Sequence, residues 1–159
     1  MPIYLQYEGI DGEVTESGHA KWIEIQSFSW GCGRSINTTL GAAQSREASS
    51  PSVGEIQLSK QTDIASPKLF MESVVGEAKK AVIEFVQTSG TAQDVFLRYE
   101  LTNTLISSYS ISGGGDGRPG EGISLNFSKV EMKFTPFDDK HKAGSPIPVG
   151  YNISEGKKV

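Results

Sequence analysis

The sequence contains one cysteine, Cys32, and two histidines among its 159 residues. A single thiol has no partner for an internal disulfide, and its setting WGCGR is not a paired-cysteine metal or redox motif. His19 and His141 lie in the polar contexts ESGHAK and DDKHK, with no motif that joins them to a serine or cysteine nucleophile. We therefore expect no catalytic residues, no metal site and no cofactor.

A basic surplus and long apolar runs are also missing. Fifteen Lys and Arg residues against nineteen Asp and Glu residues give a net charge of −4, so no basic surface is expected for nucleic acid or an anionic membrane. No run approaches the ~20 apolar residues of a bilayer span. The N-terminal MPIYLQYEGIDGE has neither the basic start nor the apolar stretch of a secretory signal. We expect a protein made in the cytoplasm, without membrane insertion.

Most of the chain is patterned as β-strands in one domain, residues 1–159. Segments 21–30 (KWIEIQSFSW) and 81–88 (AVIEFVQT) carry apolar residues on both faces, although a strand with one solvated face alternates cleanly. The second face therefore needs a cover from another element or another subunit. Ser27 and Ser29 continue the parity of Ile23 and Ile25, which puts them on one face.

Further strands are expected along the rest of the chain, at IYLQY, EIQLS and IPVGYNI. Residues 94–112 read as one strand of nineteen residues, several times the usual length, which must bend or break. In segment 123–134 the apolar residues change parity, and a β-bulge at Ser128 and Lys129 would return both sets to one face. These two sets are Ile123, Leu125 and Phe127, then Val130, Met132 and Phe134.

One short α-helix is predicted at SPKLFMESVVG, residues 66–76. Ser66 suits the N-cap, Pro67 suits the first helical position, and Gly76 suits a left-handed stop. Because isolated helices of this length are marginal in water, an apolar stripe must be buried. The helix is then a lid on the sheet or a contact surface, and packing in the core is the expected role. The residues of this stripe are Phe70, Met71, Val74 and Val75.

Two long segments match no helix or strand. Residues 31–54 are rich in Ser, Thr, Ala and Gly, and connections of this length are usually functional or disordered. Arg34 and Arg46 in this segment either pair with carboxylates of a neighbouring molecule or are simply solvated. Residues 113–122 contain a literal G-x-G-x-x-G, but this motif precedes a strand instead of a helix, which favours a mobile hairpin over a nucleotide site.

The order of these segments resembles the Hcp (haemolysin-coregulated protein) family, the tube protein of bacterial type VI secretion systems. The resemblance runs from about Tyr4 to Ile153. It implies a mainly β fold: an antiparallel β-barrel of two packed sheets, with the short helix on its flank and 31–54 as a long extended loop. The segments that carry it are YLQYEGIDGEVTESGHAKWIEIQSFSWG, ASPKLFMESVVG, LTNTLISSYSISGGG, ISLNFSKVEMKF and PVGYNI.

The resemblance further implies a structural function without catalysis. Six copies would form a ring, and stacked rings would form a tube carrying small effectors. Further partners would be a spike protein of the VgrG type and a sheath, and export would use the type VI apparatus without a cleaved signal peptide. The candidate residues are Arg34, Ser35, Asn37 and Arg46 for contacts of the loop with adjacent subunits or rings, Val82 and Val86 for the subunit interface, and Ser27, Ser29 and Ser112 for the lumen.

Two alternatives remain open at this point. A tail tube protein of a phage or phage-like contractile particle would share the ring assembly. A monomeric ligand-binding barrel, or a hydrolase with a dispersed site, would not need strands with two apolar faces. Oligomeric state separates the second alternative from the tube.

Overall fold

Two antiparallel β-sheets packed face to face form the body of the chain, in a computed structural model that describes residues 1–37 and 49–159. No helix in these residues has the length and apolar character needed to cross a membrane. The elements are β1 (Ile3–Tyr7), β2 (Ile23–Ile25), β3 (Ser27–Ser29), β4 (Cys32–Gly33), β5 (Ser52–Val53), β6 (Ile56–Gln61), α1 (Ser66–Val75), β7 (Lys79–Ser89), β8 (Ala92–Ser112), β9 (Gly120–Asn126), β10 (Lys129–Phe134), β11 (Ile147–Asn152) and β12 (Lys157–Lys158).

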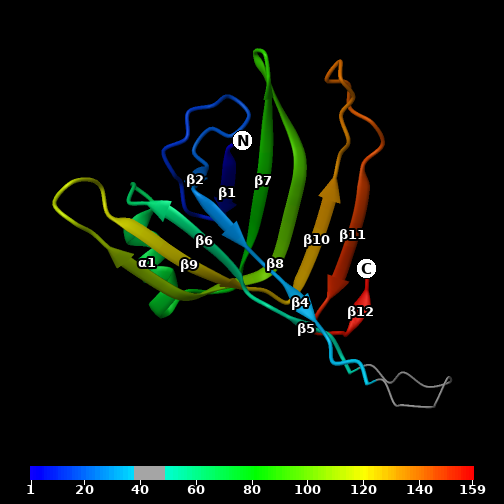
Figure 1. Cartoon of the computed structure of the whole chain (residues 1–159). Coiled ribbons are helices and arrows are strands. Elements are labelled where there is room, and N and C mark those ends of the chain that lie inside the picture. Colours follow the sequence, from blue (N-terminus) through cyan, green and yellow to red (C-terminus); the bar gives the residue numbers. More distant parts are fainter. Residues whose placement is uncertain (38–48) are drawn as a thin grey trace.

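The two sheets share strand β8. In the large sheet the order is β12-β11-β10-β8-β7-β1-β2, and in the small sheet it is β3-β6-β9-β8 (Figure 1). β8 pairs with β7 and β10 through its first part, and then with β9 from Leu105 to Ser112. The long strand predicted at 94–112 is therefore one strand that changes partners and passes from one layer to the other.

The chain also passes between the layers at Gln26. β2 pairs with β1, whereas β3 pairs with β6, and the backbone N–H of Gln26 donates to the carbonyl of Ser59 at 2.7 Å. The mainly β, antiparallel fold with a helix on its flank agrees with the prediction. Within the described residues, however, β2 and β3 pair into different layers, so the two sheets do not form one continuous barrel ladder.

This crossing changes which side chains point inward. Ile23 and Ile25 are buried in the core, whereas beyond Gln26 it is Phe28 that packs inward, stacked on Tyr99. Ser27 and Ser29 are exposed. The prediction that they share the face of the two isoleucines is wrong, because the parity switches at the crossing. The apolar residues on both faces of 21–30 thus reflect one strand that serves two layers.

A similar crossing replaces the predicted bulge in segment 123–134. β9 ends at Asn126 in the small sheet and β10 starts at Lys129 in the large sheet. Phe127 and Val130, on either side of the break, are each 5 % exposed. Both apolar sets lie on the core-facing side of their sheets, as expected, but a change of sheet brings them there, and Phe134 at the end of β10 is 40 % exposed. The core between the layers is formed by residues that include Leu5, Ile23, Ile56, Ile83, Leu101, Ile123 and Leu125.

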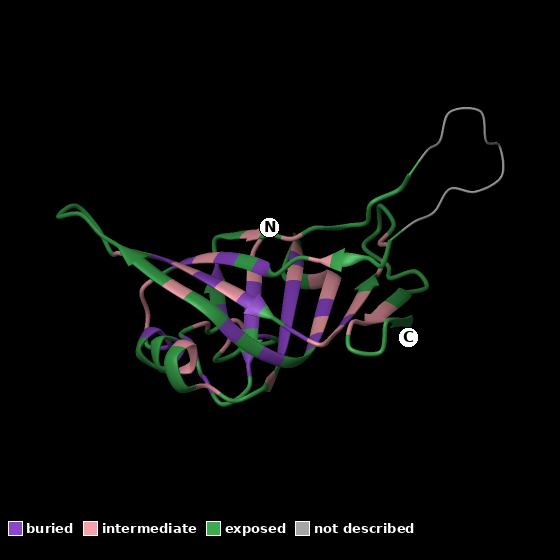
Figure 2. Cartoon of the chain, turned by 90° about the horizontal axis from the view of Figure 1, so that it is seen from below, coloured by how far each residue is buried: buried purple, intermediate pink, exposed green. Residues whose placement is uncertain are grey.

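Helix α1 lies on the flank, beside β8 (Figure 1). Its N-cap is Ala65 instead of Ser66, and Gly76 adopts an extended conformation instead of a left-handed one. Leu69 is fully buried, but most of the helix surface is exposed (Figure 2). The expected packing of the apolar stripe in the core is wrong: the exposed fractions are 50 % for Phe70, 51 % for Met71, 64 % for Val74 and 70 % for Val75.

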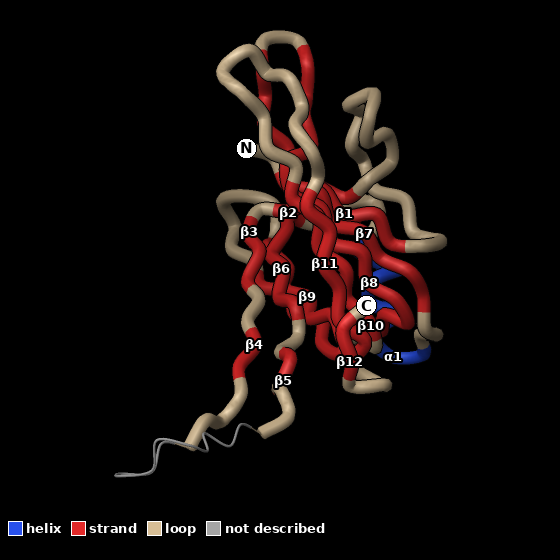
Figure 3. Tube along the Cα trace, turned by 90° about the vertical axis from the view of Figure 1, so that its right-hand side faces the viewer, coloured by secondary structure: helices blue, strands red, loops and turns tan. Residues whose placement is uncertain are grey.

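The two ends of segment 31–54 pair with each other. Cys32 lies opposite Val53 and Gly33 lies opposite Ser52, so β4 and β5 form a two-stranded ribbon. This ribbon leaves the body of the chain as an arm (Figure 3). The backbone N–H of Ser49 donates to the carbonyl of Ser35 at 2.9 Å, which extends the pairing beyond the ribbon.

Candidate functional site

The exposed face of the small sheet is uncharged and rich in hydroxyl groups. The register places Ser27 beside Ser59, Gly122 and Ser110 in one row across four strands, and the next rows follow the same pattern. We call this surface the hydroxyl face. Its residues are Ser27, Ser29, Gln57, Ser59, Gln61, Ser108, Ser110, Ser112, Gly120, Gly122 and Ser124.

Serines of the hydroxyl face bond to one another and to the backbone beside them. Ser27 and Ser59 share a hydrogen bond between their hydroxyls, and Ser108 Oγ donates to Ser124 Oγ at 2.9 Å. A Cβ atom at Gly122 would lie 3.0 Å from Ser110 Oγ. Glycine at this position therefore leaves room for the Ser110 hydroxyl in the row. The face offers weak, evenly spread polar contacts and no charged group that would hold a ligand strongly.

A buried ion pair lies on the opposite side of the small sheet, where α1 begins. The ammonium of Lys60, which is 0 % exposed, donates to Glu121 Oε1 at 2.7 Å and to Asp63 Oδ1 at 2.9 Å. Ser66 Oγ donates to Glu121 Oε1 at 2.6 Å, and the Tyr109 hydroxyl donates to Glu121 Oε2. This network joins α1 to β6, β8 and β9.

The electrostatics of the network indicate a structural role. Burial by itself raises the pKa of Glu121, but hydrogen bonds from Lys60, Ser66 and Tyr109 outweigh it, so the pKa lies below its usual range. Burial, followed by the hydrogen bond to Glu121, raises the pKa of Tyr109 to about 12. Glu121 is therefore ionised and Tyr109 neutral at pH 7, and neither group is poised to exchange protons there.

His19 is a second buried polar residue that the sequence analysis missed. It is 3 % exposed, with Nδ1 2.5 Å from Glu16 Oε2 and Nε2 2.8 Å from Glu84 Oε2. The guanidinium of Arg98 bonds to the other oxygen of Glu84. Both ring nitrogens are thus engaged: Nδ1 contacts Glu16 within the segment 8–22, and Nε2 fastens this segment to Glu84 of the large sheet. The spacing of Glu16 and His19 was the one sequence signal for this contact.

The three lumen candidates lie on one face of the small sheet, at its two opposite edges. Ser27, Ser29 and Ser112 all lie on the hydroxyl face, on the two outermost strands of the small sheet. Sequence reasoning found these three, but it did not find the remaining serines of the face, because a row across four strands depends on a register that is not evident from one sequence.

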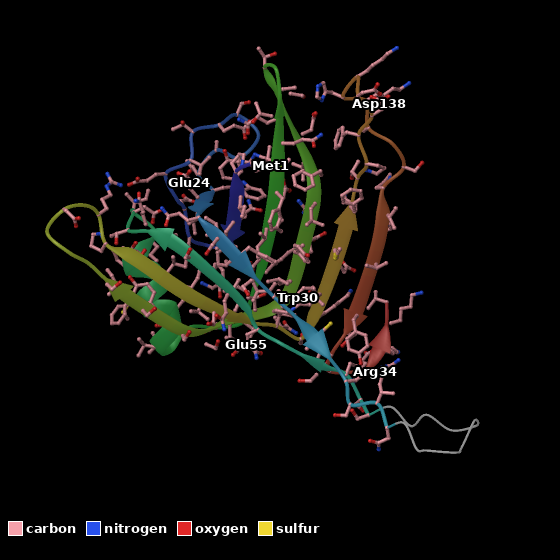
Figure 4. The ribbon with its side chains drawn as sticks, viewed as in Figure 1. Met1, Glu24, Trp30, Arg34, Glu55 and Asp138 are labelled. Atoms are coloured by element: carbon pink, nitrogen blue, oxygen red, sulfur yellow. The ribbon has the colours of Figure 1, made fainter. Side chains whose placement is uncertain are left out.

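The loop candidates are placed on the arm. Arg34, Ser35 and Asn37 are exposed, and Figure 4 shows Arg34 beyond the ribbon, away from the core. The backbone N–H of Ser35 donates to Ser49 Oγ at 3.0 Å. Arg46 lies outside the described residues.

The interface candidates Val82 and Val86 are buried within the chain itself, with exposed fractions of 4 % and 0 %. Val82 lines a hollow together with Trp22 and Lys21 of the segment 8–22. The backbone N–H of Val86 donates to the carbonyl of Pro2 at 3.0 Å. The apolar face that the sequence analysis assigned to a neighbouring subunit is therefore covered by N-terminal residues of the same chain.

Comparison with known proteins identifies a family. The family model described as "Type VI secretion system effector, Hcp" matches residues 4–134. Protein hcp1 of Pseudomonas aeruginosa is 28 % identical over 158 residues, which cover 98 % of this chain and 96 % of that protein. A solved structure of a type six secretion system protein superposes with a TM-score of 0.93 at 31 % identity, covering 99 % of each chain. Hcp1 from Salmonella typhimurium superposes with a TM-score of 0.80 at 25 % identity, covering 99 % of this chain and 98 % of that one.

Proposed function

This chain belongs to the Hcp family of type VI secretion system proteins, and from that premise we propose that six copies of it close into a ring whose channel is lined by the hydroxyl face. The family is a structural one that forms ring-like tube assemblies. The observation that carries the proposal is an exposed, uncharged face on a sheet whose two edge strands have no further pairing partner among the described residues.

The two edges support a ring. Within the described residues β3 pairs with β6 alone, and residues 105–112 of β8 pair with β9 alone. An unpaired strand edge presents N–H and C=O groups to another chain. When one edge of a copy meets the different edge of the next copy, the contact is heterologous, and repeated rotation closes a ring. The four-stranded sheets of the copies then form the wall of one channel.

The chemistry of the hydroxyl face suits a channel that conveys protein. Hydroxyl and amide groups hydrate well, and the face has no carboxylate, ammonium or large apolar side chain that would hold cargo strongly. Small effectors carried in the lumen would make many weak contacts and leave readily. In this proposal the chain conveys other proteins and catalyses no reaction.

The remaining partners follow from the same assembly. Arms 31–54 reach adjacent subunits or rings in the stack, with Arg34, Ser35, Asn37 and Arg46 as contact residues. A spike protein of the VgrG type caps the tube and a sheath surrounds it. The chain is made in the cytoplasm and exported through the type VI apparatus without a cleaved signal peptide.

Labelling with small gold clusters tests the placement of the hydroxyl face. In a Cys32→Ser background, Ser110→Cys is labelled with a maleimide-linked gold cluster and imaged in negative stain. We expect six-fold rings with gold in the central channel, because the side chain of Ser110 belongs to the hydroxyl face. The control is Lys140→Cys, in an exposed turn between β10 and β11, whose label should lie away from the channel. Gold from Ser110→Cys on the rim of the ring would contradict the proposal.

A further inference from the structure

Helix α1 presents an apolar surface that no other element of residues 1–37 and 49–159 covers. Leu69 is fully buried against the body of the chain, while the other apolar side chains of the helix are at least half exposed. Phe70 contacts the ring of Tyr109 on β8 at a centroid distance of 6.0 Å, so the surface adjoins the unpaired edge of the small sheet. We call it the helix patch. It consists of Ile64, Phe70, Met71, Val74 and Val75, together with the exposed Ile111, which lies on the same face of β8 as Tyr109.

A second apolar surface lies at the other side of the chain, on β10 and β11 (Figure 1). Phe134 pairs with Ile147, and Met132 pairs with Val149, so these four side chains share one face of the large sheet. Phe134, Ile147 and Val149 are 40 %, 59 % and 51 % exposed. We call this surface the overhang patch, because it continues the core-facing side of the large sheet beyond the part that the small sheet covers.

Both patches lie on the same side of the small sheet, opposite the hydroxyl face. Tyr109, which contacts the helix patch, alternates along β8 with Ser108 and Ser110 of the hydroxyl face. At the other edge, Phe28 alternates with Ser27 and Ser29 and packs on Tyr99, which is paired with Met132 of the overhang patch. If β3 of one copy pairs with β8 of a second copy, the helix patch of the second copy therefore faces the overhang patch of the first.

We propose that the helix patch of each copy packs against the overhang patch of the next copy and forms the apolar part of the contact that closes the ring. This inference rests on the proposed function, and it adds the partner surfaces. The two patches differ and lie on opposite sides of the chain, as a heterologous contact requires. Neither contains a charged residue, and Phe and Met are residue types enriched at the centre of protein interfaces.

Cross-linking tests this contact directly. In a Cys32→Ser background, the double variant Val74→Cys/Ile147→Cys is treated with a short bis-maleimide, and denaturing electrophoresis follows. The two positions lie on opposite sides of one chain, so cross-links form between copies. We expect a ladder reaching six chains, whereas each single variant gives one chain. The matched control, Val159→Cys/Ile147→Cys, places one thiol outside the helix patch and should give no ladder.

Light scattering of the Cys32→Ser chain separates the two possible failures. Rings without a cross-linked ladder would overturn the contact between the patches and leave the ring itself standing. Single chains at every concentration would overturn the ring and the contact together.

Charge substitutions give a second, independent readout. Val74→Asp and Ile147→Asp each place a carboxylate in the contact, where desolvation opposes assembly, so we expect the mass to fall from six chains to one with circular dichroism unchanged. Val159→Asp makes the same chemical change at an exposed site outside both patches and should keep the ring. Rings retained by both patch variants would contradict the inference.

Discussion

Two charged side chains with no exposed surface, Lys60 and Glu121, hold the start of α1 against the small sheet. The position of Lys60 follows the inward parity of Ile56 and Leu58 in β6. Its ammonium is stabilised by the carboxylates of Glu121 and Asp63 and by the carbonyl of Gln61. Because a buried charge is tolerated only when it is paired and hydrogen-bonded, the network makes the fold depend on both partners.

Removal of the ammonium alone should be costly. Lys60→Met leaves the Glu121 carboxylate buried without its cation, and we expect a loss of roughly 3–5 kcal/mol in the free energy of unfolding. The double variant Lys60→Met/Glu121→Gln removes both charges and should recover much of that loss. Urea unfolding at one fixed protein concentration measures both, and a cost below about 1 kcal/mol for Lys60→Met would contradict the buried pair.

The same pair predicts a pH dependence of stability. The pKa of Glu121 is lower in the folded chain than in the unfolded chain, where the pKa of a glutamate is ~4.3. The stabilisation is therefore complete above that unfolded value and is lost as the pH falls through the lower folded value. We expect the unfolding free energy of Lys60→Met/Glu121→Gln to decline less steeply below pH ~4.3 than that of the unsubstituted chain. The carboxyls of Glu16 and Glu100, whose pKa values are also lowered, are present in both proteins. Parallel declines would rule out this role for Glu121.

At the scale of elements, α1 shows how an apolar pattern can be assigned to the wrong partner. The apolar residues of the helix cover a wide arc that includes Leu69 and the helix patch. The body of the chain buries Leu69, and the remaining arc is left for the contact proposed between copies.

Stability measurements distinguish the two sides of α1. Leu69→Ala removes a fully buried side chain and should cost about 2–5 kcal/mol of unfolding free energy. Val74→Ala, at a side chain that is 64 % exposed, should change it by about 0.5 kcal/mol or less in dissociated chains. Thermal unfolding at high dilution provides the comparison. Equal losses of unfolding free energy for the two variants would contradict the packing of α1 through Leu69 alone.

The strands were more predictable than their partners. Period-two spacing located β1, β7, β8 and β11 to within a few residues, because local pattern decides which segments are extended. At Gln26 and at Phe127, where the chain passes from one sheet to the other, the apolar residues of the sequence change parity. The first change of parity predicted a second covering element and the second predicted a bulge, because parity alone does not tell which sheet a strand joins. Lys60 contacts Glu121, which is 61 positions further along the chain, and His19 contacts Glu84, which is 65 positions further. No local pattern encodes contacts over such separations.

At the scale of the whole molecule, three features have a place in one ring. In the part of the chain that the structure describes, the small sheet has unpaired edges on both sides and its exposed face is uncharged. The helix patch and the overhang patch lie on opposite sides of the chain. Each feature is unexplained in a single copy. In a closed ring the edges pair, the hydroxyl face lines the channel and the two apolar patches cover each other.

Light scattering behind size-exclusion chromatography, run over a dilution series, tests the ring most directly. The account predicts a mass near six times 17.1 kDa, about 103 kDa, at the concentrated end of the series. Dilution should convert rings into single chains, and species of two to five chains should stay minor. In a closed ring every copy makes two contacts, so an open assembly with two free ends is less stable. A mass of 17.1 kDa at every concentration would contradict the account.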